Sequence, residues 1–200
     1  NVIPAGCGDT DGKIFTDVYV WSGDPVQSII WSNGATTANL LDVPAANYVC
    51  TLTVANTGCK AIKGWDIPVV KPLRQDICII TVDSLTTSNL IVWEKAQPVG
   101  IDYYNIYRET SQAGLYQLVG TVPYSDESLY NDLVASPNVR SWRYKISSVD
   151  DCGNESEQSS NHKTIHLVIS HGLGNDINLF WDSYEGFNYS NFLLKRHTDA

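Results

Sequence analysis

The sequence predicts an all-β protein built from tandem β-sandwich modules, of which the last is incomplete. Short segments alternate between apolar and polar residues and are separated by clusters of turn-forming residues, whereas no long segment has the 3.6-residue period of a helix. The alternating segments are rich in Val, Ile, Thr, Tyr and Trp, which suit half-buried strands. A length of 200 residues accommodates two or three modules, because one sandwich takes roughly 70–100 residues.

Eight segments carry the alternating pattern that is typical of strands. They are Lys13–Val20, Ile29–Trp31, Tyr48–Val54, Ile77–Val82, Leu90–Glu94, Tyr103–Arg108, Tyr116–Val122 and Trp142–Val149. Turn-forming clusters lie between them, among them Ser32–Ala35, Gln112–Gly114 and Asp150–Asn154.

The charge balance argues against a nucleic-acid ligand, and the lengths of the apolar stretches argue against a membrane-spanning helix. The formal net charge is −9, and the 13 lysines and arginines form no cluster, whereas nucleic-acid binders usually carry a basic stripe. No stretch approaches the roughly 20 apolar residues of a membrane-spanning helix. We therefore expect neither a nucleic-acid ligand nor a membrane-spanning segment.

An internal repeat defines the module boundaries. The segment LIVWE at 90–94 resembles INLFWD at 177–182, and the tryptophan of each segment is followed 15 positions later by an arginine. The offset between the two tryptophans is 88 residues, the size of one sandwich. Together with Pro68 and Pro72, which mark a linker, this predicts modules at 1–72, 73–167 and 168–200, the last one incomplete.

The middle module resembles a fibronectin type III domain. The resemblance lies in Trp93, in the strand Tyr104-x-Ile106-Tyr107-Arg108, in Leu133 and in the segment 142–149 (WRYKISSV). Trp142 stands where the family usually has its corner tyrosine, so we expect its indole N–H to be the donor there. Residues 168–200 resemble the first three strands of a second such domain. The resemblance implies the core residues Trp93, Leu133, Trp142, Tyr144 and Trp181, and Trp31 of the first module is expected to be a core residue as well.

Residues 1–72 resemble the short immunoglobulin-like, PKD-like repeats of bacterial gliding-type adhesins. The matching pieces are WSNGATT at 31–37 and YVCTLTVANTGC at 48–59. Such repeats joined to fibronectin modules are similar to large surface proteins exported by the type IX system. The resemblance implies an extracellular or cell-surface location and neighbouring domains in a longer chain.

The five cysteines show no zinc-type spacing. Each of the first two modules has one cysteine at its start and one at its last hairpin, and in sandwiches of these kinds the first strand begins at the same end as the turn of that hairpin. The resemblance thus implies disulfides Cys7–Cys59 and Cys78–Cys152, with Cys50 as a free thiol. The alternative is that all five cysteines are reduced.

Catalysis is not expected, because the sequence lacks G-x-S-x-G and H-E-x-x-H motifs. The histidines all fall in the last quarter of the chain: His162, His166, His171 and His197. His162 and His166 would lie about 13 Å apart on one strand, too far to chelate one ion. The loop Asp9–Gly12 lacks the later glutamate of a calcium loop and is expected to be a polar turn. No cofactor or metal is therefore predicted.

Two functions remain open. The first is a non-catalytic structural or adhesive segment of a secreted or cell-surface bacterial protein, with an unidentified protein or glycan ligand. The second is an accessory module beside a secreted hydrolase, with carbohydrate binding as its candidate role. The tyrosines that could form a sugar-stacking platform are Tyr103, Tyr107, Tyr116, Tyr124 and Tyr130, although alternating tyrosines more often pack across strands.

Overall fold

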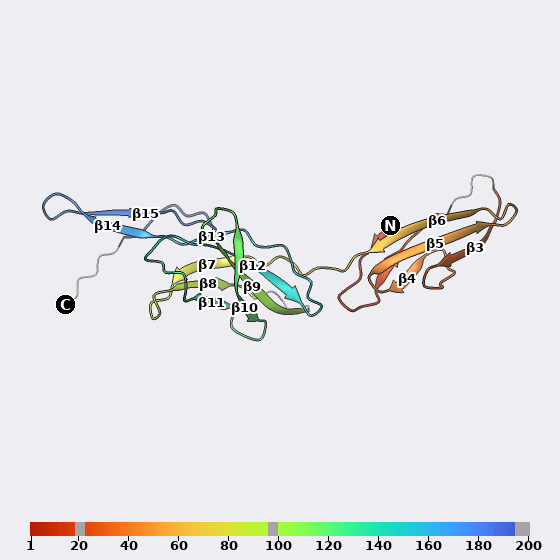
Figure 1. Cartoon of the computed structure of the whole chain (residues 1–200), viewed down its shortest axis with the longest axis horizontal. Helices are drawn as coiled ribbons and strands as arrows, with labels where there is room; N and C mark the ends of the chain where they lie inside the picture. The colour runs from red at the N-terminus through yellow and green to blue at the C-terminus, as the bar shows by residue number, and fades with distance from the viewer. Residues whose placement is uncertain (19–22, 96–99, 195–200) are drawn as a thin grey trace. The chain divides into compact units, whose positions relative to one another are not determined.

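The computed structural model describes residues 1–18, 23–95 and 100–194 and contains only β-strands and connecting segments there (Figure 1). The strands form small antiparallel sheets, which confirms the predicted all-β class. The chain divides into two compact units. The first comprises Asn1–Pro72 and Asp150–Asn154, and the second comprises Leu73–Val149 and Glu155–Ala200.

The first unit has two three-stranded sheets around one core. One sheet has the order β1 (Val2–Ile3), β2 (Gly12–Ile14), β4 (Leu40–Val43), and the other has the order β3 (Val26–Trp31), β5 (Ala46–Val54), β6 (Lys60–Ile67). The core between them consists of Ala5, Ile14, Trp31, Leu40, Val43, Tyr48 and Ile67. Trp31 is 1% exposed, and its indole N–H donates to the Thr37 carbonyl at 2.9 Å. The buried indole therefore keeps a hydrogen-bond partner.

The second unit contains a sandwich of three plus four strands. The smaller sheet has the order β11 (Leu129–Asp132), β8 (Asn89–Trp93), β7 (Ile77–Val82). The larger sheet has the order β10 (Tyr116–Pro123), β9 (Ile101–Glu109), β12 (Arg143–Asp150), β13 (His162–Lys163). Seven strands arranged three against four are typical of immunoglobulin-like sandwiches. The core residues are Ile77, Ile80, Ile91, Trp93, Tyr104, Ile106, Val122, Ala135, Tyr144 and Ile146.

Most of the predicted strands are present, with shifted ends. The predicted strand Lys13–Val20 corresponds to β2, which ends at Ile14, and residues 19–20 of that prediction lie outside the described residues. The alternating pattern does not reveal β4, β6 and β11, nor the two-residue strands β1 and β13. In β6, residues 60–64 are exposed on both faces, so the apolar alternation appears only at Trp65 and Ile67.

The segment that follows the sandwich forms a separate hairpin of β14 (Leu167–His171) and β15 (Ile177–Trp181). β15 lies 88 residues after β8, as the repeat requires. In β8 alternate residues are buried, but in β15 nearly all are exposed. Trp181 is 42% exposed, so its assignment to a core is wrong. Within the described residues, β14 and β15 form a two-stranded sheet of their own.

Leu133 and Trp142 are also predicted core residues, and both are less buried than a core position requires. Leu133 is 73% exposed, contrary to expectation. The reason is the carboxylate of Asp132, which accepts the backbone N–H groups of Val134 and Ala135 and forms a turn that buries Ala135 instead. Trp142 is half-buried, and its indole N–H donates to the Ser136 carbonyl at 2.8 Å. The indole thus makes the corner hydrogen bond.

Candidate functional site

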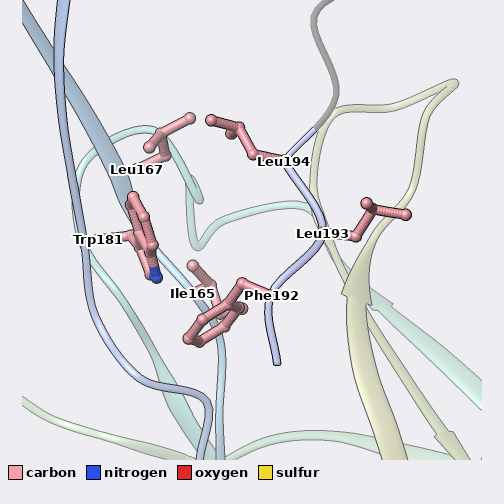
Figure 2. Close-up of a pocket in the computed structure, with 6 residues that line it drawn as sticks. All are labelled: Ile165, Leu167, Trp181, Phe192, Leu193 and Leu194. Atoms are coloured by element: carbon pink, nitrogen blue, oxygen red, sulfur yellow. The ribbon is translucent and has the colours of Figure 1, made fainter. Parts of the chain in front are cut away.

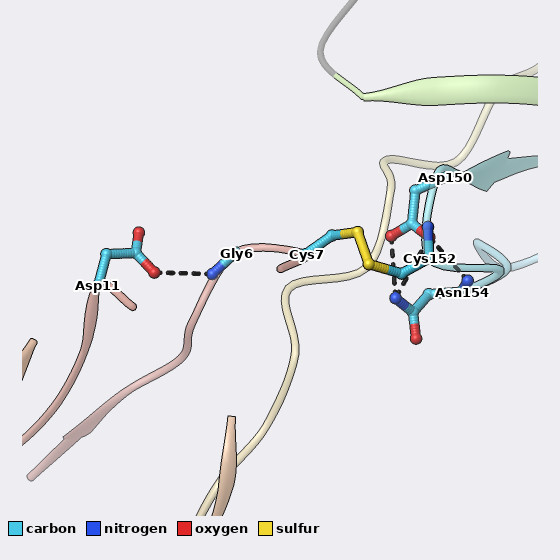
Figure 3. The surroundings of a disulfide bond; sticks show 6 residues. All are labelled: Gly6, Cys7, Asp11, Asp150, Cys152 and Asn154. Carbon is cyan, nitrogen blue, oxygen red and sulfur yellow. Dashed lines mark hydrogen bonds between the residues drawn. A yellow bond between two sulfur atoms is a disulfide. The ribbon is translucent and has the colours of Figure 1, made fainter. Parts of the chain in front are cut away.

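One disulfide joins cysteines that are 145 positions apart. Cys7 is bonded to Cys152, with their Cα atoms 5.9 Å apart (Figure 3). The predicted pairs Cys7–Cys59 and Cys78–Cys152 are therefore wrong. Cys59 and Cys78 are free and exposed, and Cys50 is free and half-buried.

Strand pairing explains why Cys7 does not reach Cys59. Ala5 bridges to Val69, just beyond the end of β6, whereas Cys59 precedes the start of β6. An extended strand rises about 3.3 Å per residue, so these two ends of β6 are roughly 30 Å apart. In the second unit, the Leu73 carbonyl accepts the Ser148 hydroxyl, so Leu73 rather than Cys78 lies beside the end of β12.

Both cysteines of the disulfide lie in turns held by carboxylates (Figure 3). The Asp150 carboxylate accepts the backbone N–H groups of Cys152 at 3.0 Å and Asn154 at 2.7 Å, and also the Asn154 side-chain amide. On the other side, the Asp11 carboxylate accepts the Gly6 N–H at 2.8 Å. The turn falls on Cys7 and Gly8, whereas residues 9–11 form an irregular connection and Gly12 begins β2, so the turn expected over Asp9–Gly12 lies two residues earlier.

The same place contains a group of possible metal ligands. The Cys7 and Cys152 sulfur atoms and an Asp150 carboxylate oxygen lie within 4.8 Å of one another. Thiolates are the sulfur ligands of metals, and here both sulfur atoms are bonded to each other. In this state the group is a covalent cross-link.

Within the second unit, the segment that follows β15 packs against the sandwich. We call residues 184–187 the clasp. The Lys163 N–H donates to the Glu185 carbonyl at 2.9 Å, so Glu185 extends the larger sheet beyond β13. Tyr184 packs against the sandwich core, and its hydroxyl accepts the Ile80 N–H at 2.9 Å. The clasp therefore anchors the β14–β15 hairpin to the preceding sandwich.

Charged side chains reinforce the clasp. The Glu185 carboxylate accepts two guanidinium hydrogen bonds from Arg143, at 2.7 and 2.8 Å, and one from the Asn161 amide at 2.9 Å. It also lies 3.2 Å from the Lys163 ammonium group. The Arg143 hydrogen bonds first, and then the interactions with Lys163, lower the pKa of Glu185 to about 2. Glu185 thus stays ionised over the whole physiological range.

His162 contacts the clasp through both a hydrogen bond and ring packing. It is 5% exposed, and its Nδ1 lies 2.9 Å from the Tyr184 hydroxyl. The hydroxyl accepts the Ile80 N–H, and in the neutral tautomer with an unprotonated Nδ1 it donates its own proton to that nitrogen. Burial lowers the pKa of His162, which favours this neutral form. The His162 ring also packs edge-on against Tyr184 and Phe187.

Replacement of Gly186 by alanine is expected to open the clasp. Gly186 has a φ of +135°, and an added Cβ would lie 2.3 Å from the His162 ring. Amide exchange at Lys163, Glu185 and Ile80 should therefore accelerate by at least tenfold. Gly174→Ala is the matched control, since Gly174 has a φ of +71° but no neighbour within 4 Å of its Cβ. Equal exchange rates in the two variants would contradict this account.

The clasp is expected to weaken as the pH falls. The folded-state pKa of His162 lies below its usual value of about 6.5. The open clasp therefore binds more protons below pH 6.5, and stability is lost from there down through the folded pKa. A second loss follows between about pH 4.3 and pH 2, where Glu185 becomes protonated. A pH series of the Ile80 amide signal checks both steps, and Glu185→Gln should remove only the second.

An apolar groove lies beside the β14–β15 hairpin. It is lined by Ile165, Leu167, Trp181, Phe192, Leu193 and Leu194 (Figure 2). The Trp181 and Phe192 rings meet edge-on at 5.6 Å between centroids. The repeat assigns this side of β15 to a core face, because the matching residues of β8 are buried. The repeat predicts a third strand here, but the described residues 189–194 form none, and residues 195–200 of that prediction lie outside the described residues.

The tyrosines proposed as a sugar platform do not share one surface. Tyr124 and Tyr130 pack against the core, and the Tyr130 hydroxyl donates to the Val119 carbonyl. Tyr107 lies beside Glu155, and its hydroxyl donates to that carboxylate at 2.5 Å. The Lys145 ammonium lies 4.6 Å from the centroid of the Tyr116 ring. The set is therefore divided between packing and polar roles.

The described residues contain no helix that is long and apolar enough to cross a membrane. No family model and no curated protein matches the sequence. Among solved structures, the chain is similar to a segment of two fibronectin type III domains from chicken tenascin. The identity is 15% and the TM-score 0.42, with 82% of this chain and 95% of that segment covered.

The chain is also similar to two further solved structures. The chicken CNTN1 FN1–FN3 domains are 12% identical with a TM-score of 0.41, and the match covers 82% of this chain and 65% of that one. A β-1,2-glucanase from Parabacteroides distasonis is 17% identical with a TM-score of 0.39, covering 76% of this chain and 26% of the enzyme. At these identities and TM-scores, the matches carry no information about function.

Proposed function

We propose that this chain is a non-catalytic structural segment of an extracellular or cell-surface protein of adhesive type. The observation that carries the proposal is the Cys7–Cys152 disulfide, whose cysteines lie beside backbone N–H groups that are bonded to carboxylates. Disulfides persist in oxidising compartments and are rare in the cytosol. The resemblance of residues 1–72 to gliding-type adhesin repeats supports a bacterial surface as the setting.

The surroundings of the histidines support a non-catalytic role. A catalytic triad needs a nucleophile held by a base that is itself oriented by a third group. His162 is buried against Tyr184 in the clasp, and the His166 Nε2 lies 3.1 Å from the Asn138 carbonyl. Both rings are engaged in holding the segment that follows the sandwich.

A thiol count tests the extracellular placement. The chain is produced once with an export signal into an oxidising periplasm and once in a reducing cytoplasm, and thiols are titrated in denaturant. The exported protein should have three thiols, those of Cys50, Cys59 and Cys78, and the cytoplasmic protein five. Five thiols in the exported protein, or faster unfolding of the exported form than of the reduced form, would contradict the proposal.

A second candidate is a glycan-binding accessory module, and one observation favours it. The Glu155 carboxylate gathers the hydroxyls of Tyr107 and Ser147 and the amide of Asn105 on the larger sheet. An aromatic ring beside a carboxylate and an amide is a combination that can bind sugars. Saturable binding on a glycan panel that is lost in Tyr107→Ala and retained in Tyr130→Phe would favour this second function over the first.

A further inference from the structure

We infer a mechanical function: the Cys7–Cys152 disulfide carries tension past residues 8–151, so that a loaded chain keeps its two hydrophobic cores folded. Force applied along a polypeptide follows the shortest covalent path. In the oxidised chain, that path runs from Cys7 through the two sulfur atoms to Cys152. The inference rests on the proposed function only for the premise that the chain bears load in its natural setting.

The positions of the core residues relative to the disulfide support this function. Every residue of the second core, from Ile77 to Ile146, lies inside the closed loop. All members of the first core except Ala5 lie inside it as well. A pull on the two ends of the chain therefore cannot separate these residues unless the disulfide breaks.

Only the edges of the fold remain in the path of the force. On the amino-terminal side these are β1 and the bridge of Ala5 to Val69. On the carboxyl-terminal side they are the segment 153–161, which is bonded to β12 through Glu155, Ser156 and Ser159, and then β13, the clasp and the β14–β15 hairpin. β13 contributes two ladder pairs to β12, and the ion pair of Glu185 with Arg143 adds a further attachment. Tension can detach these parts one at a time. Their loss removes Ala5 from the first core and Tyr184 from the edge of the second, but all other buried core residues stay within the closed loop.

Reduction would release the closed loop. Two electrons and two protons from a dithiol reductant convert the disulfide to the thiols of Cys7 and Cys152, while the reductant becomes a disulfide. The 145 positions that the bond spans then join the loaded path. At roughly 3.3–3.6 Å per residue, they add about 500 Å of extended chain.

Single-molecule stretching of the full chain between terminal fusion handles tests the inference. Total extension in the presence of dithiothreitol should exceed that of the oxidised protein by about 500 Å. The variant Cys7→Ser/Cys152→Ser should show the long extension under both conditions. The variant Cys59→Ser/Cys78→Ser removes two exposed thiols and should keep the full difference.

Two outcomes would overturn the inference. The first is an oxidised chain that extends as far as the reduced one. The second is loss of the redox difference in Cys59→Ser/Cys78→Ser, which would mean that the force bypasses other segments through other cysteine pairs. Both readouts are independent of where the protein resides, so failure of the extracellular assignment in the thiol count would leave this test unaffected.

Discussion

Replacement of Trp93 by alanine is expected to lower the free energy of unfolding of the second unit by about 3–5 kcal/mol. Trp93 is 1% exposed and packs edge-on against Tyr104, with 5.3 Å between ring centroids. It lies in the smaller sheet and Tyr104 lies in the larger one, so the missing indole would leave a cavity between the two sheets. The surrounding strands can close such a cavity only in part, since each is held by its ladder.

The internal repeat supplies a matched control for this prediction. Trp181 occupies in β15 the position that Trp93 occupies in β8, but it is 42% exposed. Trp181→Ala should therefore cost less than about 1 kcal/mol, because little packed surface is lost. Urea titrations followed by far-ultraviolet circular dichroism measure both variants. If Trp93→Ala and Trp181→Ala lowered the free energy of unfolding equally, burial would not explain the contribution of the tryptophan to stability.

The sequence predicts those parts of the structure that depend on local periodicity. Strands such as β7 and β12 are found because apolar and polar residues alternate along them, and the same alternation places Trp93 inside. The offset of 88 residues locates β15 for the same reason. Leu133 has the same apolar character, but the Asp132 carboxylate bonds to the two following N–H groups and turns the chain before that side chain can enter the core.

The long-range features could not be predicted in this way. Cys7 could in principle pair with any of four other cysteines, and the choice depends on the pairing of Ala5 with Val69 across the first unit. The clasp was missed because Tyr184 and Glu185 follow a strand in a polar loop with no periodic pattern. One signal was available, namely a glycine between Glu185 and Phe187, since a glycine flanked by large side chains can mark a close approach to another ring.

The second large loss of unfolding free energy is expected where the buried polar network around Asp132 is broken. Asp132 is 2% exposed and accepts a guanidinium hydrogen bond from Arg108 at 2.6 Å and the Tyr144 hydroxyl at 2.9 Å. The Asn89 amide donates to the same hydroxyl at 3.0 Å. Burial raises the pKa of Tyr144 well above its ordinary value, so the hydroxyl remains a neutral donor. The network connects β11 to β9, β12 and β8 across both sheets.

Asp132→Ala is therefore expected to cost about 3–5 kcal/mol of unfolding free energy. The loss leaves the Arg108 charge, 11% exposed, without its carboxylate, and it also removes the acceptor of Tyr144 and of two backbone N–H groups. Asp76→Ala is the matched control, because its ion pair with Arg74 has side chains 55% and 46% exposed. An exposed pair contributes at most about 1 kcal/mol.

A double-mutant cycle with Arg108→Met separates the ion pair from the other contacts of Asp132. Methionine keeps much of the apolar stem of the arginine and removes the charge, so the cost of the uncompensated guanidinium disappears from the double variant. Arg108→Met/Asp132→Ala should consequently cost less than the sum of the two single variants, by about 1–3 kcal/mol. Strict additivity in urea titrations would mean that the carboxylate acts through the turn after β11 and not through Arg108. A loss in Asp132→Ala no larger than that in Asp76→Ala would mean that neither the turn nor the ion pair contributes much to stability.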